Sequence, residues 1–321
     1  MGRGIAHVFA YAGYGVDLVD LKPRAPEPAR ALGEAALAEV GANLGFLREL
    51  GVLDAAQRTA ILARIRFVAA DGAPQALAAA DCVFEGVTET VAAKREALAL
   101  IGQHVRPDAL VASTTSTILS DTLAAFVPNP ERFLNTHFLN PAFLIPLVEI
   151  MPASATSAAS YARMAALLES AGKVGVRCGQ RPGYIVPRIQ AAAMNEAARI
   201  VEEGAATPAD VDRAVRAGFG PRYATMGLAE FIDFGGLDIL YYASSYLMQA
   251  LPAERFRPPA IIEAKMKAGE RGLREGAGLY DHRGRDVAAY TRELLKRQVD
   301  LFRFLGLLPA PGPERGANGP Q

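Results

Sequence analysis

The sequence has few cysteines and no excess of charge of either sign. Its two cysteines, Cys82 and Cys178, lie far apart without the spacing of a metal site, so we expect no bound metal and a cytoplasmic chain with reduced thiols. The 34 basic residues balance 34 acidic ones, which leaves no charged surface for nucleic acid or for an anionic membrane. No apolar run approaches the roughly 18 residues that a membrane-spanning helix needs. These absences indicate neither a nucleic-acid partner nor a membrane partner.

The 321 residues contain enough apolar side chains for a large core, because 51% are hydrophobic and only 21% are charged. Up to about residue 180, short β-rich runs alternate with helical stretches, which predicts an α/β doubly wound parallel sheet. Beyond it the periodicity is helical, and Thr207-Pro208 is typical of a helix start. We therefore expect an α/β domain at 1–180, a helical domain at 181–308 and a disordered Pro/Gly-rich tail at 309–321. The expected strands lie at 16–21, 82–87, 109–115, 132–138 and 147–151. The expected helices lie at 4–12, 29–66, 90–105 and 188–204, and the second of them is expected to break near Gly51 and at Leu53-Asp54.

A glycine turn opens the chain and runs into a helix, with Gly2 and Gly4 at its start. Asp20 follows at the end of the next strand. In a dinucleotide-binding unit such glycines admit a pyrophosphate to a helix N-terminus, and the acidic residue accepts hydrogen bonds from the adenosine ribose. Asp20 would repel a 2′-phosphate and so favours NAD over NADP, although Lys22 and Arg24 lie close by. Both features are also common in proteins that bind no nucleotide.

A second group of polar residues lies at predicted strand ends. Ser116 follows one strand, His137 ends another, and Glu149 is twelve residues further on. A histidine with a carboxylate on the adjacent strand suits a general base, because the carboxylate fixes the imidazole tautomer and stabilises the imidazolium. Taken alone, His137 is more typical of a hydrogen-bonded structural histidine than of a catalytic base, and Ser116 could be a strand-end cap.

In combination these residues resemble one family, the NAD-dependent L-3-hydroxyacyl-CoA dehydrogenases, and among them the 3-hydroxybutyryl-CoA dehydrogenases. The resemblance extends from Met1 to about His282, and the order and spacing of its pieces are more specific than any single motif. The matching segments lie at 1–6, 19–20, 84–89, 112–116, 137–141, 147–149, 182–186 and 276–280.

The resemblance implies a role for each matching residue. His137 would be the catalytic base and Glu149 its orienting partner, while Ser116 would bind the substrate oxygen and Asn140 would lie beside the nicotinamide. Further residues would contact NAD, namely Gly2, Gly4, Asp20, Glu89 and Lys94, with Arg274 where the family often has a lysine. The resemblance further implies oxidation of a short-chain L-3-hydroxyacyl-CoA to the 3-ketoacyl-CoA, and a homodimer formed through the helical domain.

The sequence departs from the family at its start. The family's dinucleotide-binding fold is Rossmann-type, with a strand and two further glycines before the position of Gly2. This sequence begins at Met1 and lacks them. We expect the two neighbours of that strand to lack hydrogen-bond partners, and we expect that the start was assigned downstream of the true one.

Two further departures concern the substrate. Pro187 stands where the family usually has an asparagine that faces the active site, and Asn195 is a candidate substitute. Pro146, just before Leu-Val-Glu, resembles relatives that oxidise free hydroxy acids, of the L-gulonate or L-carnitine type. A free 3-hydroxy acid is therefore an alternative substrate. A non-catalytic member of the family is a second alternative, motivated by the shortened glycine motif.

Overall fold

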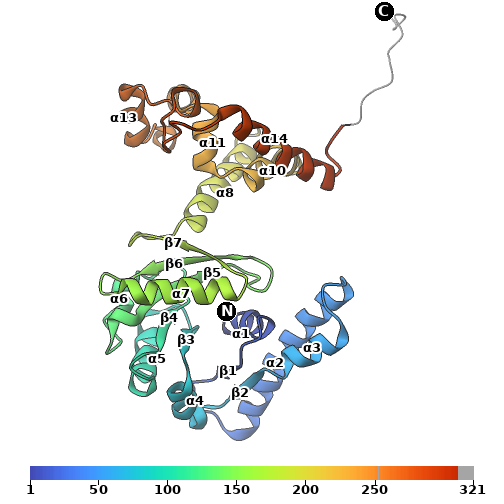
Figure 1. Ribbon diagram of the computed structural model, residues 1–321, viewed down its shortest axis with the longest axis vertical. Coiled ribbons are helices and arrows are strands. Elements are labelled where there is room, and N and C mark those ends of the chain that lie inside the picture. Colours follow the sequence, from blue (N-terminus) through green and yellow to red (C-terminus); the bar gives the residue numbers. More distant parts are fainter. Residues whose placement is uncertain (252, 310–321) are drawn as a thin grey trace, which may run out of the picture. The chain divides into compact units, whose positions relative to one another are not determined.

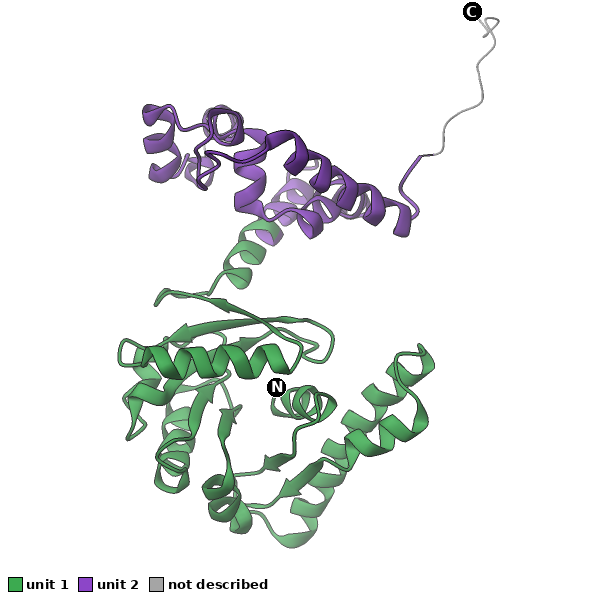
Figure 2. Cartoon of the chain, viewed as in Figure 1, with its two compact units in different colours: residues 1–193 green, residues 194–321 purple. Residues whose placement is uncertain are grey.

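The computed structural model describes residues 1–251 and 253–309 and divides the chain into two compact units, 1–193 and 194 onward (Figure 2). The predicted domain boundary at 180 lies just before helix α8 (Val186–Glu202), whereas the two units divide within that helix. Apart from Pro309, the predicted disordered tail lies outside the described residues.

The first unit is an α/β fold whose short strands alternate with helices (Figure 1). Its strands are β1 (Val16–Val19), β2 (Ile65–Val68), β3 (Cys82–Glu85), β4 (Leu110–Ser113), β5 (Phe133–Phe138), β6 (Leu147–Pro152) and β7 (Val174–Arg177). Its helices before α8 are α1 (Gly2–Tyr11), α2 (Pro26–Glu49), α3 (Ala55–Leu62), α4 (Ala73–Ala79), α5 (Val91–His104), α6 (Ser120–Ala124) and α7 (Ala158–Ser170). The predicted fold class is confirmed.

Pairing among the strands is parallel with one exception. β1 pairs with β2, and β3 to β7 form a five-stranded sheet in sequence order. β5 and β6 run antiparallel, unlike the all-parallel sheet that the alternating pattern predicted. This reversal arises because a short loop joins the two strands, and a parallel pair would need a long crossover.

One predicted helix, at 29–66, is wrong at its end. α3 stops at Leu62 and residues from Ile65 form strand β2. The break before α3 is where the sequence predicted it, since Asp54 accepts a hydrogen bond from the backbone N–H of Gln57. β2 exists because it pairs with β1 over four residues, a tertiary interaction that overrides the helical pattern around it.

The described strands form two separate sheets, and β1 and β3 are edge strands of these sheets, as are β2 and β7. β1 pairs only with β2 and β3 only with β4, and residues of both β1 and β3 line one cavity of about 1860 Å³. Met1 and Gly2, at the start of α1, also line it. Apolar side chains from the strands face it, among them Val16, Leu18 and Phe84.

The second unit is helical, as predicted. Thr207 caps its first complete helix by accepting a hydrogen bond from the N–H of Asp210 at 3.2 Å. The helices after α8 are α9 (Pro208–Ala214), the π-helical turn η3 (Val215–Phe219), α10 (Gly220–Thr225), α11 (Leu228–Gly235), α12 (Leu237–Ala250), α13 (Ala260–Ala268) and α14 (Val287–Phe304). Over residues 1–251 and 253–309, no helix has the length and apolar character to cross a membrane, and no group of acidic, histidine and cysteine side chains could hold a metal.

Candidate active site

The centre of the candidate site is a hydrogen-bonded pair on β5 and β6. The register of these antiparallel strands places His137 directly opposite Glu149, and Nδ1 of His137 lies 2.8 Å from Oε2 of Glu149. Glu149 is 0% exposed and His137 is 7% exposed. A buried carboxylate on Nδ1 fixes the tautomer with its proton on that atom, so Nε2 carries the lone pair. The pair can therefore accept a proton at Nε2 while Glu149 stabilises the resulting charge.

The other oxygen of Glu149 is held by the chain that leads into α8. Its Oε1 accepts hydrogen bonds from the backbone N–H groups of Ile185 and Val186, at 2.8 and 2.9 Å. Just before them, the ring of Tyr184 stacks on the imidazole of His137, with centroids 4.7 Å apart and planes at 20°. Both carboxylate oxygens thus have partners, as a buried charge requires.

Ser116 lies on a loop after β4 that wraps around the carboxylate of Glu89. Oε1 of Glu89 accepts hydrogen bonds from the hydroxyls of Thr115 and Thr117 and from the N–H groups of Ser116 and Thr117. Burial opposes ionisation of Glu89, but these bonds and the nearby Lys94 ammonium outweigh it and hold the pKa of Glu89 at about 2. Glu89 is therefore an anion near neutral pH, and it orders the loop.

Lys94, predicted to contact the cofactor, lies in a buried ion pair. It is 0% exposed, and its Nζ lies 3.0 Å from Glu85 and 3.3 Å from Glu89. Glu85 also accepts a hydrogen bond from the Ser113 hydroxyl at 2.6 Å. Lys94 therefore reaches the candidate site through Glu89, and direct contact with a cofactor stays a prediction.

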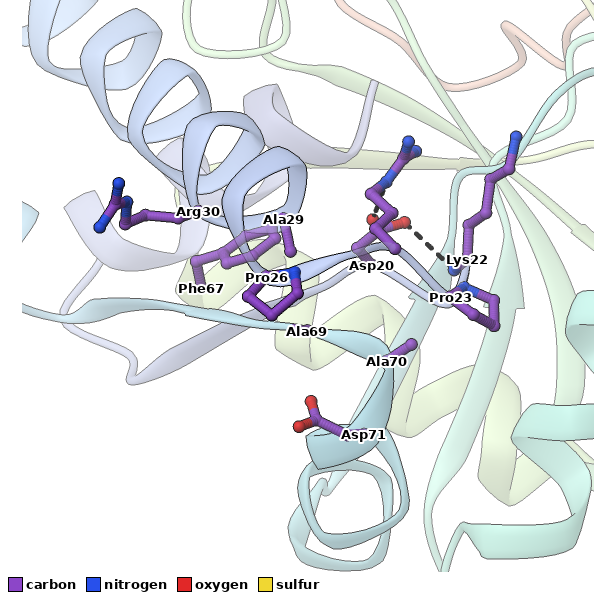
Figure 3. A pocket seen from close by; sticks show the side chains of 11 residues that line it. Asp20, Lys22, Pro23, Pro26, Ala29, Arg30, Phe67, Ala69, Ala70 and Asp71 are labelled. Carbon is purple, nitrogen blue, oxygen red and sulfur yellow. Dashed lines mark hydrogen bonds and ion pairs between the residues drawn. The ribbon is translucent and has the colours of Figure 1, made fainter.

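Asp20 borders a cavity of about 660 Å³ that is lined also by Lys22 and Arg30 (Figure 3). Together with Lys22 and Arg24, Asp20 also lines the larger cavity of about 1860 Å³. Its carboxylate forms an ion pair with Arg24 at 2.5 Å and accepts a hydrogen bond from the Lys22 N–H at 3.2 Å. Its position past the end of β1 is the one that a ribose-binding carboxylate takes in dinucleotide-binding folds.

Two glycines allow close approach of the backbone near the start of α1. A Cβ on Gly86 would lie 3.4 Å from the backbone nitrogen of Gly2, and one on Gly4 would lie 3.1 Å from the Cβ of Ala142. The start of α1 thus lies close to the residue that follows β3 and to the loop that follows β5. Together with the cavity at Asp20, this arrangement fits NAD, with Gly2 and Gly4 at the pyrophosphate and Asp20 at the ribose.

The structure brings some predicted residues together and leaves others apart. His137 meets Glu149, and Ser116 meets Glu89, with the hydroxyl of Ser116 3.4 Å from Glu89. Asn140 is exposed, three residues past His137, just before Pro141. Sequence reasoning gave Tyr184 no role, although Tyr184 lies in the matching segment 182–186 and follows the Pro182-Gly183 turn.

Comparison with known proteins identifies the family. The description "3-hydroxyacyl-CoA dehydrogenase, NAD binding domain" matches residues 1–181, and "3-hydroxyacyl-CoA dehydrogenase, C-terminal domain" matches residues 183–282. The chain belongs to the 3-hydroxyacyl-CoA dehydrogenase family. The predicted activity, that of an NAD-dependent 3-hydroxyacyl-CoA dehydrogenase, is confirmed, and so is the predicted cofactor, NAD.

Individual relatives carry different names. A probable 3-hydroxybutyryl-CoA dehydrogenase of Deinococcus radiodurans is 32% identical over 282 residues, which cover 88% of this chain and 96% of the relative. A crystal structure of a 3-hydroxyacyl-CoA dehydrogenase from Archaeoglobus fulgidus has a TM-score of 0.72 at 32% identity, covering 96% of both chains. The 5-formyl-3-hydroxy-2-methylpyridine 4-carboxylate 5-dehydrogenase of Mesorhizobium japonicum is 31% identical over 306 residues, with 95% of both chains covered.

Proposed function

We propose that this protein oxidises a short-chain L-3-hydroxyacyl-CoA to the 3-ketoacyl-CoA, with His137 as the general base. The observation that carries the proposal is the buried contact between Nδ1 of His137 and the Glu149 carboxylate. It leaves Nε2 without a hydrogen-bond partner among the described residues, which is the state that a proton acceptor requires.

In this proposal each residue acts at one atom. Nε2 of His137 takes the proton of the substrate's 3-hydroxyl, and Glu149 stabilises the imidazolium. Ser116 donates to the substrate oxygen as its charge changes, and Asn140 orients the ring of the cofactor. Bound NAD supplies the acceptor for the hydride that leaves C3. Only a neutral imidazole accepts a proton, so the oxidation requires the neutral form of His137.

A steady-state comparison of substrates tests the proposal. We expect kcat/KM with NAD to be higher for (S)-3-hydroxybutyryl-CoA than for free 3-hydroxybutyrate, L-gulonate or L-carnitine. A ratio that favours a free acid would remove the CoA substrate from the proposal. Saturable binding of NAD would argue against the non-catalytic alternative, and its absence would favour that alternative.

A free 3-hydroxy acid is the second candidate substrate, since one relative is named for a substrate that carries no CoA, although the group that this name marks for oxidation is a formyl group. The Mesorhizobium japonicum protein is named for a pyridine carboxylate. Its alignment covers 95% of this chain, whereas that of the Deinococcus radiodurans relative covers 88%. Pro187, which follows the turn that contacts Glu149, has no side-chain hydrogen bond to offer a substrate. Replacing Pro187 by asparagine should raise kcat/KM for the acyl-CoA if the lost contact was to that substrate.

Asp20→Ser is expected to shift cofactor preference toward NADP. The change removes the charge that repels a 2′-phosphate and frees Arg24, whose guanidinium now pairs with Asp20 at 2.5 Å. We expect the ratio of kcat/KM for NADP over NAD to rise by about 10²-fold, which corresponds to roughly 2.7 kcal/mol. Steady-state kinetics with each cofactor measure the change. An added Arg24→Ala substitution should cancel much of the gain for NADP, and equal ratios in the single and double variants would contradict this role of Arg24.

We further propose that the protein is a cytoplasmic homodimer. α12 exposes apolar side chains at helical spacing, with Ile239 62%, Tyr242 63% and Tyr246 69% exposed. Residues at such spacing share one face of a helix, and a contiguous exposed apolar face is typical of an association surface. Sedimentation velocity should show a dimer that Tyr242→Glu converts to a monomer, while Lys296→Glu on α14, a control charge change, should leave it dimeric. A monomeric wild-type chain would contradict the proposal.

A further inference from the structure

We infer that Tyr184 is a positioning residue that holds the imidazole of His137 and the loop of Ser116 in one arrangement. The inference rests on the function proposed above, in which both residues meet the substrate's hydroxyl oxygen. It concerns a residue for which the sequence offered no functional prediction, and three features of the structure support it.

The ring of Tyr184 restricts the imidazole. Glu149 fixes Nδ1 of His137, but a single hydrogen bond leaves the ring free to tilt about that contact. The stacked phenol, 4.7 Å away and 20° from parallel, covers one face and removes that freedom. Nε2 therefore points in one direction, and a base held in its reactive orientation lowers the entropic part of the activation barrier.

The hydroxyl of Tyr184 ties the base to the serine loop. It donates to the backbone carbonyl of Thr115 at 2.9 Å and accepts a hydrogen bond from the side-chain amide of Asn135 at 3.3 Å. Thr115 directly precedes Ser116, and Asn135 lies on the same face of β5 as His137, two residues away. Burial raises the pKa of Tyr184, so the hydroxyl keeps the proton that it donates.

The backbone conformation of Tyr184 explains how one turn contacts both His137 and Glu149. Its φ of +50° lies in the left-handed region, the one such non-glycine residue in the described part of the chain, and it follows Gly183 at +86°. This turn directs the Tyr184 side chain onto His137 and the next two N–H groups onto Glu149. An unfavourable backbone conformation held by its surroundings is typical of functional sites.

Two substitutions separate the ring from the hydroxyl. Tyr184→Phe keeps the stack and loses the bond to Thr115, so we expect kcat to fall about 3–10-fold, with the Kd for NAD unchanged. Tyr184→Leu loses both, and we expect kcat to fall about 30–100-fold through misplacement of the base. In both variants the loss should appear in kcat rather than in KM for the cofactor. Tyr290→Phe is the matched control, because its hydroxyl bonds Glu230 in the helical unit, and it should keep wild-type kcat.

A chemical measurement tests the geometry without turnover. Diethyl pyrocarbonate modifies accessible imidazole nitrogens, and peptide mass spectrometry follows the rate at His137. We expect similar rates in wild type and Tyr184→Phe and a faster rate in Tyr184→Leu, where one face of the ring is open. If Tyr184→Leu had the wild-type kcat and the wild-type labelling rate, the inference about Tyr184 would be overturned and the proposed function would stand. Full activity in a His137 variant would instead overturn the proposed function, and the labelling rates would still test the stack.

Discussion

Replacing His137 by glutamine is expected to lower kcat for 3-hydroxyacyl-CoA oxidation by about 10²–10⁴-fold, the range that general acid–base catalysis contributes. Glutamine keeps a hydrogen-bonding group near Glu149 but has no nitrogen that can take a proton. Because Asp20 and the start of α1 are untouched, the Kd for NAD should stay at the wild-type value. Steady-state formation of NADH and a fluorescence titration with NAD measure the two quantities.

His104→Gln is the matched control for this substitution. His104 lies in the last turn of α5, outside the contacts of the candidate site, so its loss should leave kcat unchanged. A His137→Gln variant with wild-type kcat would show that another group accepts the proton.

The sequence was sufficient to predict which residues form the pair, and the structure adds why they meet. The spacing of twelve residues between His137 and Glu149 suits two strands joined by a short loop. Only the antiparallel pairing of β5 and β6 sets the two residues opposite each other. A residue period of two identifies a strand but does not give its direction. The parallel direction was predicted only from the alternation of strands with helices, and this alternation is interrupted between β5 and β6.

Features that depend on tertiary contacts were beyond the sequence. β2 is four residues long and follows a helical stretch, and its pairing with β1 determines its conformation. The stack of Tyr184 on His137 requires a left-handed backbone at a residue that rarely adopts it, which no local propensity indicates. Lys94 was assigned to the cofactor by resemblance alone, and its burial between Glu85 and Glu89 is a property of packing.

The divided sheet supports the second large prediction. β1 and β3 each have an edge without a strand partner, and both line the cavity of about 1860 Å³. This volume exceeds the roughly 300–1,000 Å³ that is typical of small-molecule pockets. Unpaired strand edges and apolar side chains around one cavity are the surroundings that a buried parallel strand requires.

A variant with an apolar five-residue strand and a glycine-containing turn joined before Met1 is therefore expected to be more stable and to bind NAD more tightly. The added strand would pair with β1 and β3 and bury apolar surface, and we expect the free energy of unfolding to rise by about 2 kcal/mol or more, net of the ordering entropy. The turn would bring further backbone N–H groups to the start of α1, so the Kd for NAD should fall by about tenfold or more. Urea unfolding and NAD titration measure the two effects.

The control is an extension of equal length in which the second and fourth strand residues are proline. Proline has no N–H to donate to a neighbouring strand, so this extension should leave both stability and NAD affinity at the values of the chain that starts at Met1. Equal gains from both extensions would mean that added length or hydrophobicity, rather than strand pairing, is responsible. No gain from the apolar extension would mean that the edges of β1 and β3 do not accept a common neighbour. If only the apolar extension raises both quantities together, one strand completes the sheet and the cofactor site at once, because β1 carries Asp20 at its end and α1 begins beside the same cavity.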